Sequence, residues 1–126
     1  MRNVDELVGV YDADSGVIGE LSYWVKARFG NAHCALCDIT HGSVRERPEW
    51  KQRRAALRVP VTTHHRNDQP AELAAVTRGN LPVVAARVDN GYVLLLGPTD
   101  IAECDGSPEK LVDAIRAAAE RLNVAL

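Results

Sequence analysis

The sequence contains no long apolar run, no internal repeat and no low-complexity tract. Its longest apolar run is the short YVLLLG, which falls far below the length of a membrane span. The first residues, MRNVDELVGVYDADSG, lack a basic start followed by an apolar stretch, which argues against a secretory signal. We therefore expect a cytoplasmic protein with no membrane partner.

Strong charge of either sign is also missing. The formal net charge is -2, so we expect no global attraction to nucleic acid or to an anionic membrane. The chain has 126 residues, of which 46% are hydrophobic and 25% charged, and this predicts one globular domain over residues 1–126. Cysteine is scarce, with three residues. In the cytoplasm, a CxxC pair is more often metal-binding or catalytic than a structural disulfide.

Apolar periodicity and turn residues predict alternating strands and helices. In chain order, we expect a strand at 7–14, helices at 16–30, 32–41 and 48–57, a strand at 58–65, a helix at 68–80, a hairpin over 81–97 and a helix at 107–126. Asn90-Gly91 is a signal for a type I′ turn, and Ser107 can cap the last helix. The strand–helix–strand start predicts a parallel pair, to which the hairpin adds antiparallel strands.

This order of elements resembles the thioredoxin-like fold over most of the chain. Pro82, in the stretch NLPVV, stands where that superfamily places a cis-proline before its third strand. The resemblance implies an α/β fold, namely a single thioredoxin-like domain with a mixed sheet. Residues 31–57 would then form a helical insertion between strands 1 and 2.

The first loop, YDADSGVIGE, resembles that of small DCC-type members of the superfamily, in which two cysteines follow a strand ending in Tyr/Phe-Asp. Here Ser15 and Ile18 occupy the expected cysteine positions, which argues against the usual thioredoxin mechanism. Asp12 and Asp14 resemble the D-x-D motif of haloacid-dehalogenase-type phosphatases. The later acidic ligands and the long core of those enzymes are missing, so we favour a solvated turn that ends the strand.

The stretch NAHCALCDITHG, residues 31–42, carries a pattern suited to metal binding. On a helix, Cys34, Cys37 and His41 fall within about 60° of one another, and His33 lies about 100° from Cys34. Two thiolates and an imidazole on one face suit zinc, with copper or iron as alternatives. The sequence therefore predicts a metal site made by Cys34, Cys37 and His41, with His33 at its edge.

A closed tetrahedral site needs a fourth ligand, for which the candidates are His33, His64, His65 and Cys104. Three protein ligands and a water would instead give an open site with catalytic potential. The role of the site stays open at this point: it could be structural, it could carry metal for delivery, or it could be catalytic. The sequence also names no protein partner.

Two other readings apply to the same stretch. With Asn31 as the helix cap, Cys34 lies in the first turn, where the helix dipole favours its thiolate, and Cys37 can resolve a mixed disulfide. This predicts a thiol-disulfide oxidoreductase as the alternative function. The third reading is core packing, in which Cys34, Ala35, Leu36 and Ile39 fill the interior together.

Two further stretches carry weaker signals. The basic helix 48–58 suggests a non-enzymatic interaction module as a second alternative. We favour a solvated helix face with Trp50 and Leu57 turned inward, and specific binding of nucleic acid is unlikely. The stretch HHRND ends the second strand. One reading places His64 or His65 near Asp12 and Asp14, at the shared end of two parallel strands, where α/β proteins bind ligands. We favour the other reading, a polar loop between strand and helix.

Overall fold

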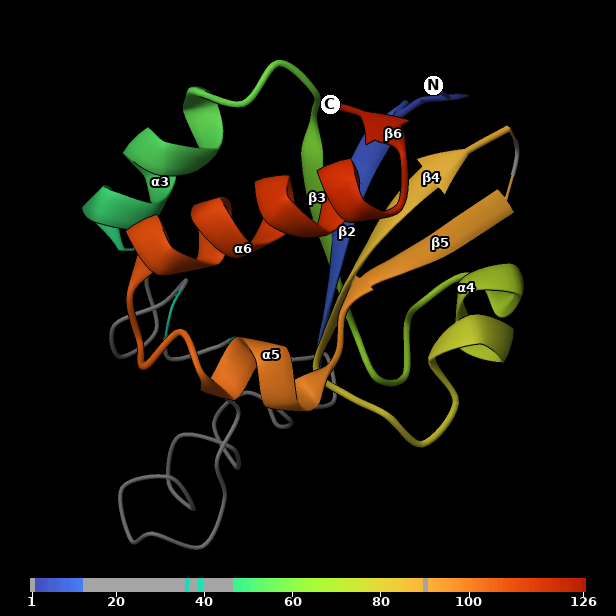
Figure 1. Cartoon of the computed structure of the whole chain (residues 1–126). Helices are drawn as coiled ribbons and strands as arrows, with labels where there is room; N and C mark the ends of the chain where they lie inside the picture. Colours follow the sequence, from blue (N-terminus) through green and yellow to red (C-terminus); the bar gives the residue numbers. More distant parts are fainter. Residues whose placement is uncertain (1, 13–35, 37–38, 40–46, 90) are drawn as a thin grey trace, which may run out of the picture.

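A four-stranded mixed sheet forms the centre of the molecule (Figure 1). The computed structural model describes residues 2–12, 36, 39, 47–89 and 91–126. The strands are β2 (Glu6–Tyr11), β3 (Val61–His65), β4 (Val83–Val88) and β5 (Gly91–Leu96), in the spatial order β3-β2-β4-β5. The β2–β3 pair is parallel, and the β2–β4 and β4–β5 pairs are antiparallel. The predicted mixed α/β sheet is therefore confirmed.

The continuous apolar run in the first long strand reflects burial on both faces of the sheet. Leu7, Val8, Val10 and Tyr11 are all buried in β2. We predicted this strand over 7–14, and β2 ends at Tyr11, where polar residues begin. The strand predicted over 58–65 starts only at Val61, because Pro60 has no N–H to donate to a sheet ladder.

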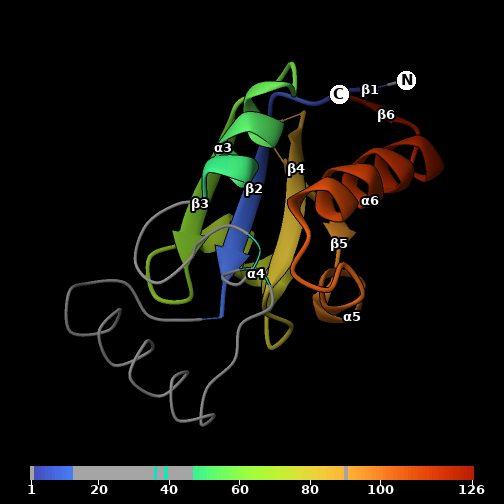
Figure 2. The same ribbon diagram turned by 90° about the vertical axis from the view of Figure 1, so that its left-hand side faces the viewer.

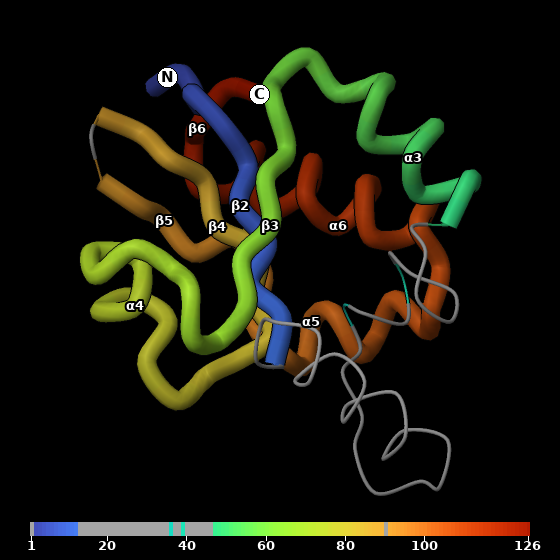
Figure 3. Tube along the Cα trace, turned by 180° about the vertical axis from the view of Figure 1, so that it is seen from behind, coloured from blue at the N-terminus to red at the C-terminus, as the bar shows by residue number. Residues whose placement is uncertain are grey.

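Helices cover both faces of the sheet (Figures 1 and 2). The helices α3 (Pro48–Ala55) and α6 (Pro108–Arg121) pack on one face, with the short α5 (Pro98–Ala102) near the end of β5. The helix α4 (Ala71–Thr77) lies on the opposite face, as the view from behind shows (Figure 3). The hydrophobic core has two parts, one on each face of the sheet. The larger one faces α3 and α6, and the smaller one joins Leu73 of α4 to Val8, Val10, Val83 and Ala85.

The last helix begins as predicted and ends earlier. The side chain of Ser107 accepts a hydrogen bond from the Lys110 backbone N–H at 3.2 Å, which confirms the predicted cap. We predicted helix over 107–126, and α6 stops at Arg121. Asn123 has a φ of 59°, a left-handed conformation that ends a helix and redirects the chain. The chain then forms β6 (Val124–Ala125), which pairs in parallel with β1 (Arg2–Asn3) and brings the two termini together (Figure 1).

The hairpin agrees with the prediction except at its turn. The Leu81–Pro82 peptide bond is cis, as predicted. We predicted a turn centred on Asn90-Gly91, but Gly91 already belongs to β5, where it pairs with Val88. Asp89 takes the left-handed conformation instead, with a φ of 53°. An Asp tolerates this conformation because its short polar side chain hydrogen-bonds locally.

The remaining helix predictions differ in their bounds. The helix expected over 68–80 is reduced to α4, and Gly79 beyond its end has a φ of 72°. The five residues of α5 were not predicted as a helix. The helices predicted over 16–30 and 32–41 lie outside the described residues, apart from Leu36 and Ile39, both of which are helical. Within the described ranges, no helix is long and apolar enough to cross a membrane.

Candidate functional site

The carboxyl ends of β2 and β3 lie side by side because these strands are parallel. Val10 pairs with His64 and Tyr11 with His65. The next residues along the two strands, Asp12 and Arg66, form an ion pair with 3.3 Å between Arg66 Nη1 and Asp12 Oδ1. The two histidines and Asp12 therefore lie at one sheet edge, as the first reading of this stretch predicts, and Asp14 lies outside the described residues. The ion-pair partner of Asp12 is Arg66, which the sequence analysis did not single out.

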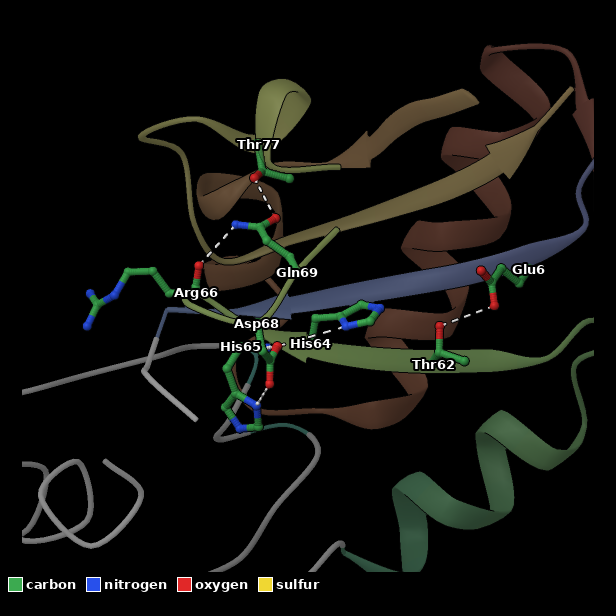
Figure 4. A network of polar contacts seen from close by, with 8 residues as sticks. All are labelled: Glu6, Thr62, His64, His65, Arg66, Asp68, Gln69 and Thr77. Atoms are coloured by element: carbon green, nitrogen blue, oxygen red, sulfur yellow. Dashed lines mark hydrogen bonds and ion pairs between the residues drawn. The ribbon is translucent and has the colours of Figure 1, made fainter. Parts of the chain in front are cut away.

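Asp68 lies between the two histidines (Figure 4). Its carboxylate accepts a hydrogen bond from the His65 backbone N–H, and its Oδ2 is 3.3 Å from His65 Nδ1. The His64 Nδ1 is 3.9 Å from Asp68 Oδ1. A carboxylate beside Nδ1 favours the tautomer that carries its proton there, which makes Nε2 the acceptor or metal-binding atom of the ring.

The ring of Tyr11 supports His65 from the neighbouring strand. The two ring centroids are 5.5 Å apart and the planes are inclined by 52°. Tyr11 is buried in the larger core, whereas His65 is half-buried. The imidazole of His65 is thus held from two directions, by an aromatic ring and by a carboxylate.

A second set of hydrogen bonds orders the turn that follows β3 (Figure 4). The Thr77 hydroxyl donates to Gln69 Oε1 at 2.9 Å, and Gln69 Nε2 donates to the Arg66 carbonyl oxygen at 3.3 Å. Thr77 is the one buried polar side chain among the described residues. This network ties the turn to α4 and so fixes the backbone that presents the histidines.

The predicted metal ligands Cys34, Cys37, His41 and His33 lie outside the described residues. Two residues of the same stretch are described, Leu36 and Ile39, with side chains only 2% and 0% exposed. Both belong to the larger core, on the face of the sheet that α3 and α6 cover. Leu36 and Ile39 are therefore packed into the core beside the sheet.

Gly9 is the point on β2 that Leu36 contacts. A Cβ atom placed at Gly9 would lie 3.3 Å from Leu36 Cδ2 and 3.7 Å from Thr63 Cγ2. Gly9 pairs with Thr63, two residues before the Tyr11–His65 pair. Since side chains two residues apart in a strand share a face, Leu36 lies on the same face of the sheet as His65.

Arg47 links Ile39 to a distant loop. Its Nη1 donates to the Ile39 carbonyl oxygen at 3.3 Å and to the Gly106 carbonyl oxygen at 2.7 Å. Gly106 lies between α5 and α6, and Arg47 directly precedes α3. The Arg47 guanidinium thus holds Ile39, the loop at Gly106 and the start of α3 together.

The basic helix α3 packs as we favoured from the sequence. Trp50 and Leu57 are buried in the larger core, which confirms the inward orientation of both. Two arginines of this region form ion pairs, Arg47 with Glu49 at 3.3 Å and Arg53 with Glu109 at 3.7 Å. These acidic neighbours reduce the positive field that a nucleic acid would meet.

Cys104 lies apart from the histidines, between α5 and α6. Its thiol is buried and forms no disulfide, and it donates to the Asp100 carbonyl oxygen at 3.4 Å. Burial raises the pKa of the Cys104 thiol, the carboxylates of Asp100 and Glu103 add to the rise, and Lys110 opposes it. A raised pKa disfavours the thiolate, the form that binds metal and attacks disulfides.

In the part of the chain that the structure describes, no group of three or more His, Cys, Asp or Glu side chains could hold a metal ion. Comparison with known proteins adds no assignment, since no protein-family model, no curated protein and no solved structure matches the chain. Of the residues that shape the His65 environment, the sequence analysis missed Asp68, Gln69 and Thr77. The spacing of HHRND contained the signal for Asp68, because Asp68 stands three positions after His65.

Proposed function

We propose that this chain is a thioredoxin-like domain that binds a transition metal through Cys34, Cys37 and His41, with His33 as an outer candidate. Zinc is the metal we expect first, and copper or iron are the alternatives. Three roles are open for this metal site: structural, metal carrier or catalytic. The observation that carries the proposal is the burial of Leu36 and Ile39 in the core.

Helical geometry connects this burial to the ligands. On a regular helix, with Cys34 at 0°, Leu36 lies at about 200° and Ile39 at about 140°. The three ligands lie at about 0°, 300° and 340°, on the opposite side of the helix. With the apolar pair in the core, the predicted helix would turn its sulfur and imidazole groups away from that core. This argues against the reading in which both cysteines only fill the interior.

The described contacts also favour a fourth ligand. Cys37 follows Leu36 directly, and consecutive Cα atoms are only 3.80 Å apart. Leu36 contacts the sheet at Gly9, whose partner Thr63 stands two residues before His65 and on the same face. On a regular helix the three ligands face away from this side, so His65, our candidate for the fourth position, completes the site only where the ligand stretch departs from a regular helix. Asp68 is then the carboxylate that orients its ring.

The sheet order and the cis peptide support the thioredoxin-like part of the proposal. The order β3-β2-β4-β5, with one parallel and two antiparallel pairs, is the arrangement that the resemblance implies. The cis Leu81–Pro82 bond immediately precedes β4, the third strand of this sheet along the chain. Ser15 and Ile18 stand at the cysteine positions of that superfamily, so any thiol chemistry must come from the insertion instead.

Native mass spectrometry of untagged protein, grown with zinc, copper and iron supplied, tests the metal site. We expect one metal ion per chain, lost largely on Cys34→Ser or Cys37→Ser because a hydroxyl is a poor ligand for soft metals. Cys104→Ala is the matched control, since it removes the third thiol and should leave the metal content unchanged. A metal-free mass, with no gain when metal is added to the reduced protein, would refute the proposal.

The thiol-disulfide alternative gives a different result in the same samples. The protein would then be metal-free, Cys34 would be alkylated quickly near neutral pH, and a mild oxidant would join Cys34 to Cys37. Core packing instead predicts slow alkylation of both thiols until the protein unfolds. Timed alkylation after the native mass measurement therefore separates the three readings.

A further inference from the structure

A cavity of about 480 Å³ opens beside α4, next to the end of β2. Its charged lining residues are Asp12, Arg66 and Arg78, and Leu81 lies at its wall. Gln69 and Thr77, the residues that tie the turn after β3 to α4, also line it (Figure 4). The cavity lies on the α4 side of the sheet, whereas Leu36 packs on the opposite side. It is therefore distinct from the proposed metal site.

Among the described lining residues, the side chains of Arg66 and Arg78 are cationic and that of Asp12 is anionic. Arg66 is 3.3 Å from the carboxylate of Asp12. Within the described part of the chain, the Arg78 guanidinium has neither a hydrogen-bond nor an ion-pair partner, and the residue is exposed. Arg78 is therefore the cationic group that the described part of the cavity offers to an anionic ligand.

The rest of the lining is apolar or already engaged. The side chains of Gln69 and Thr77 hydrogen-bond to each other, and Gln69 also donates to the Arg66 carbonyl oxygen. Ala71, Ala74 and Ala75 of α4 form a wall with Leu81. Small-molecule sites combine such apolar walls with a few charged groups that fix orientation.

We propose that this cavity binds a small organic carboxylate, with its head on Arg78 and its apolar body against the alanines of α4. A planar guanidinium matches a carboxylate through two parallel hydrogen bonds. A phosphate dianion fits less well, because its second charge would face Asp12. The alanine wall favours ligands whose apolar chain is longer than that of acetate.

Titration of the ¹⁵N-labelled protein with acetate, hexanoate and inorganic phosphate, followed by NMR, tests this site. Saturable shifts should centre on the backbone amides of Gly79 and Ala75. Hexanoate should bind more tightly than either acetate or phosphate. Arg78→Gln should weaken hexanoate binding about tenfold, because one charge-assisted pair is lost. Asp12→Asn should strengthen binding, because it removes the negative charge beside Arg66.

Arg116→Gln is the matched control, since it removes an exposed arginine from α6, on the other side of the sheet, and should leave hexanoate affinity unchanged. Ala75→Phe should block binding by filling the cavity while the amide spectrum elsewhere is retained. Three results would overturn the proposal: no saturable shift at Gly79, equal affinity for hexanoate and phosphate, or equal losses from Arg78→Gln and Arg116→Gln. None of these measurements depends on metal, so they are independent of the proposed Cys/His site.

Discussion

Leu36 packs against Gly9, the residue at the middle of β2, and a Cβ atom at that glycine would lie only 3.3 Å from Leu36 Cδ2. This distance is tighter than ordinary van der Waals contact between carbon atoms. The absence of a side chain at Gly9 therefore makes room for Leu36 to contact the sheet. Glycine is needed at this position for the space that it leaves and not for its backbone conformation, since its backbone lies in a regular strand.

Gly9→Val should destabilise the protein by about 1–3 kcal/mol, because two methyl groups would be forced against Leu36. Leu36→Ala alone should cost about 2–5 kcal/mol through the cavity that it leaves. In the double variant, the valine should partly occupy that cavity, so the combined loss should be smaller than the sum. Urea denaturation of all four proteins gives this coupling energy. Strict additivity would show that the two residues do not share the contact.

Arg47→Met should destabilise the protein by about 1–3 kcal/mol, because the carbonyl oxygens of Ile39 and Gly106 would lose their charged donor. Arg47→Lys should recover only part of the loss, since an ammonium group lacks the planar fork of a guanidinium. Arg53→Met is the control, because that arginine forms an exposed ion pair with Glu109 at 3.7 Å and should cost less than about 0.5 kcal/mol. Equal losses at the two arginines in thermal denaturation would contradict the bridging role.

The sequence predicted those elements whose pattern is local. The apolar run of β2, the two apolar stretches flanking Asn90-Gly91 and the capped, amphipathic α6 each contain their signal within a few neighbouring residues. The paired termini were missed because β1 and β6 have only two residues each, too few for any periodicity. Their pairing depends on Asn123 redirecting the chain, which becomes visible only in three dimensions.

The surroundings of the candidate site were predicted in part. Parallel pairing places the carboxyl ends of β2 and β3 together, so the shared edge of Asp12 and His65 followed from the order of elements. The hydrogen bond from Arg47 to the Gly106 carbonyl oxygen could not be predicted, because the two residues are 59 positions apart and no local sequence pattern links them. The proximity of Leu36 to Gly9 likewise joins residues 27 positions apart, with no local pattern that links them.

His65→Gln should lower zinc affinity at least tenfold if the Cys/His site takes its fourth ligand from β3, whereas His64→Gln should leave the affinity within about threefold. The two residues are adjacent, but His65 lies on the face that Leu36 contacts and His64 points toward the other face. Asp68→Asn should have an intermediate effect, because the amide orients the ring less strongly than a carboxylate does. Competition with a chromophoric chelator gives these affinities. Equal losses of zinc affinity in the His64 and His65 variants would show that His65 is not the fourth ligand. That result would leave the prediction of Cys34, Cys37 and His41 as ligands unchanged.

Cys104 should make the stability of the protein depend on pH in the alkaline range. Burial raises the pKa of its thiol in the folded state, so the unfolded chain ionises first as the pH rises. The stabilisation is therefore fully present below the ordinary thiol pKa of about 8.5, and it is lost as the pH rises towards the folded-state pKa. Cys104→Ala should lower the free energy of unfolding at pH 7 and flatten its decline above about pH 8.5. Urea denaturation of both proteins in reductant, at several values from pH 7 to about pH 10, measures the difference at each pH, and the other titrating groups cancel in it. Parallel curves would show that Cys104 ionises equally easily in the folded and unfolded states.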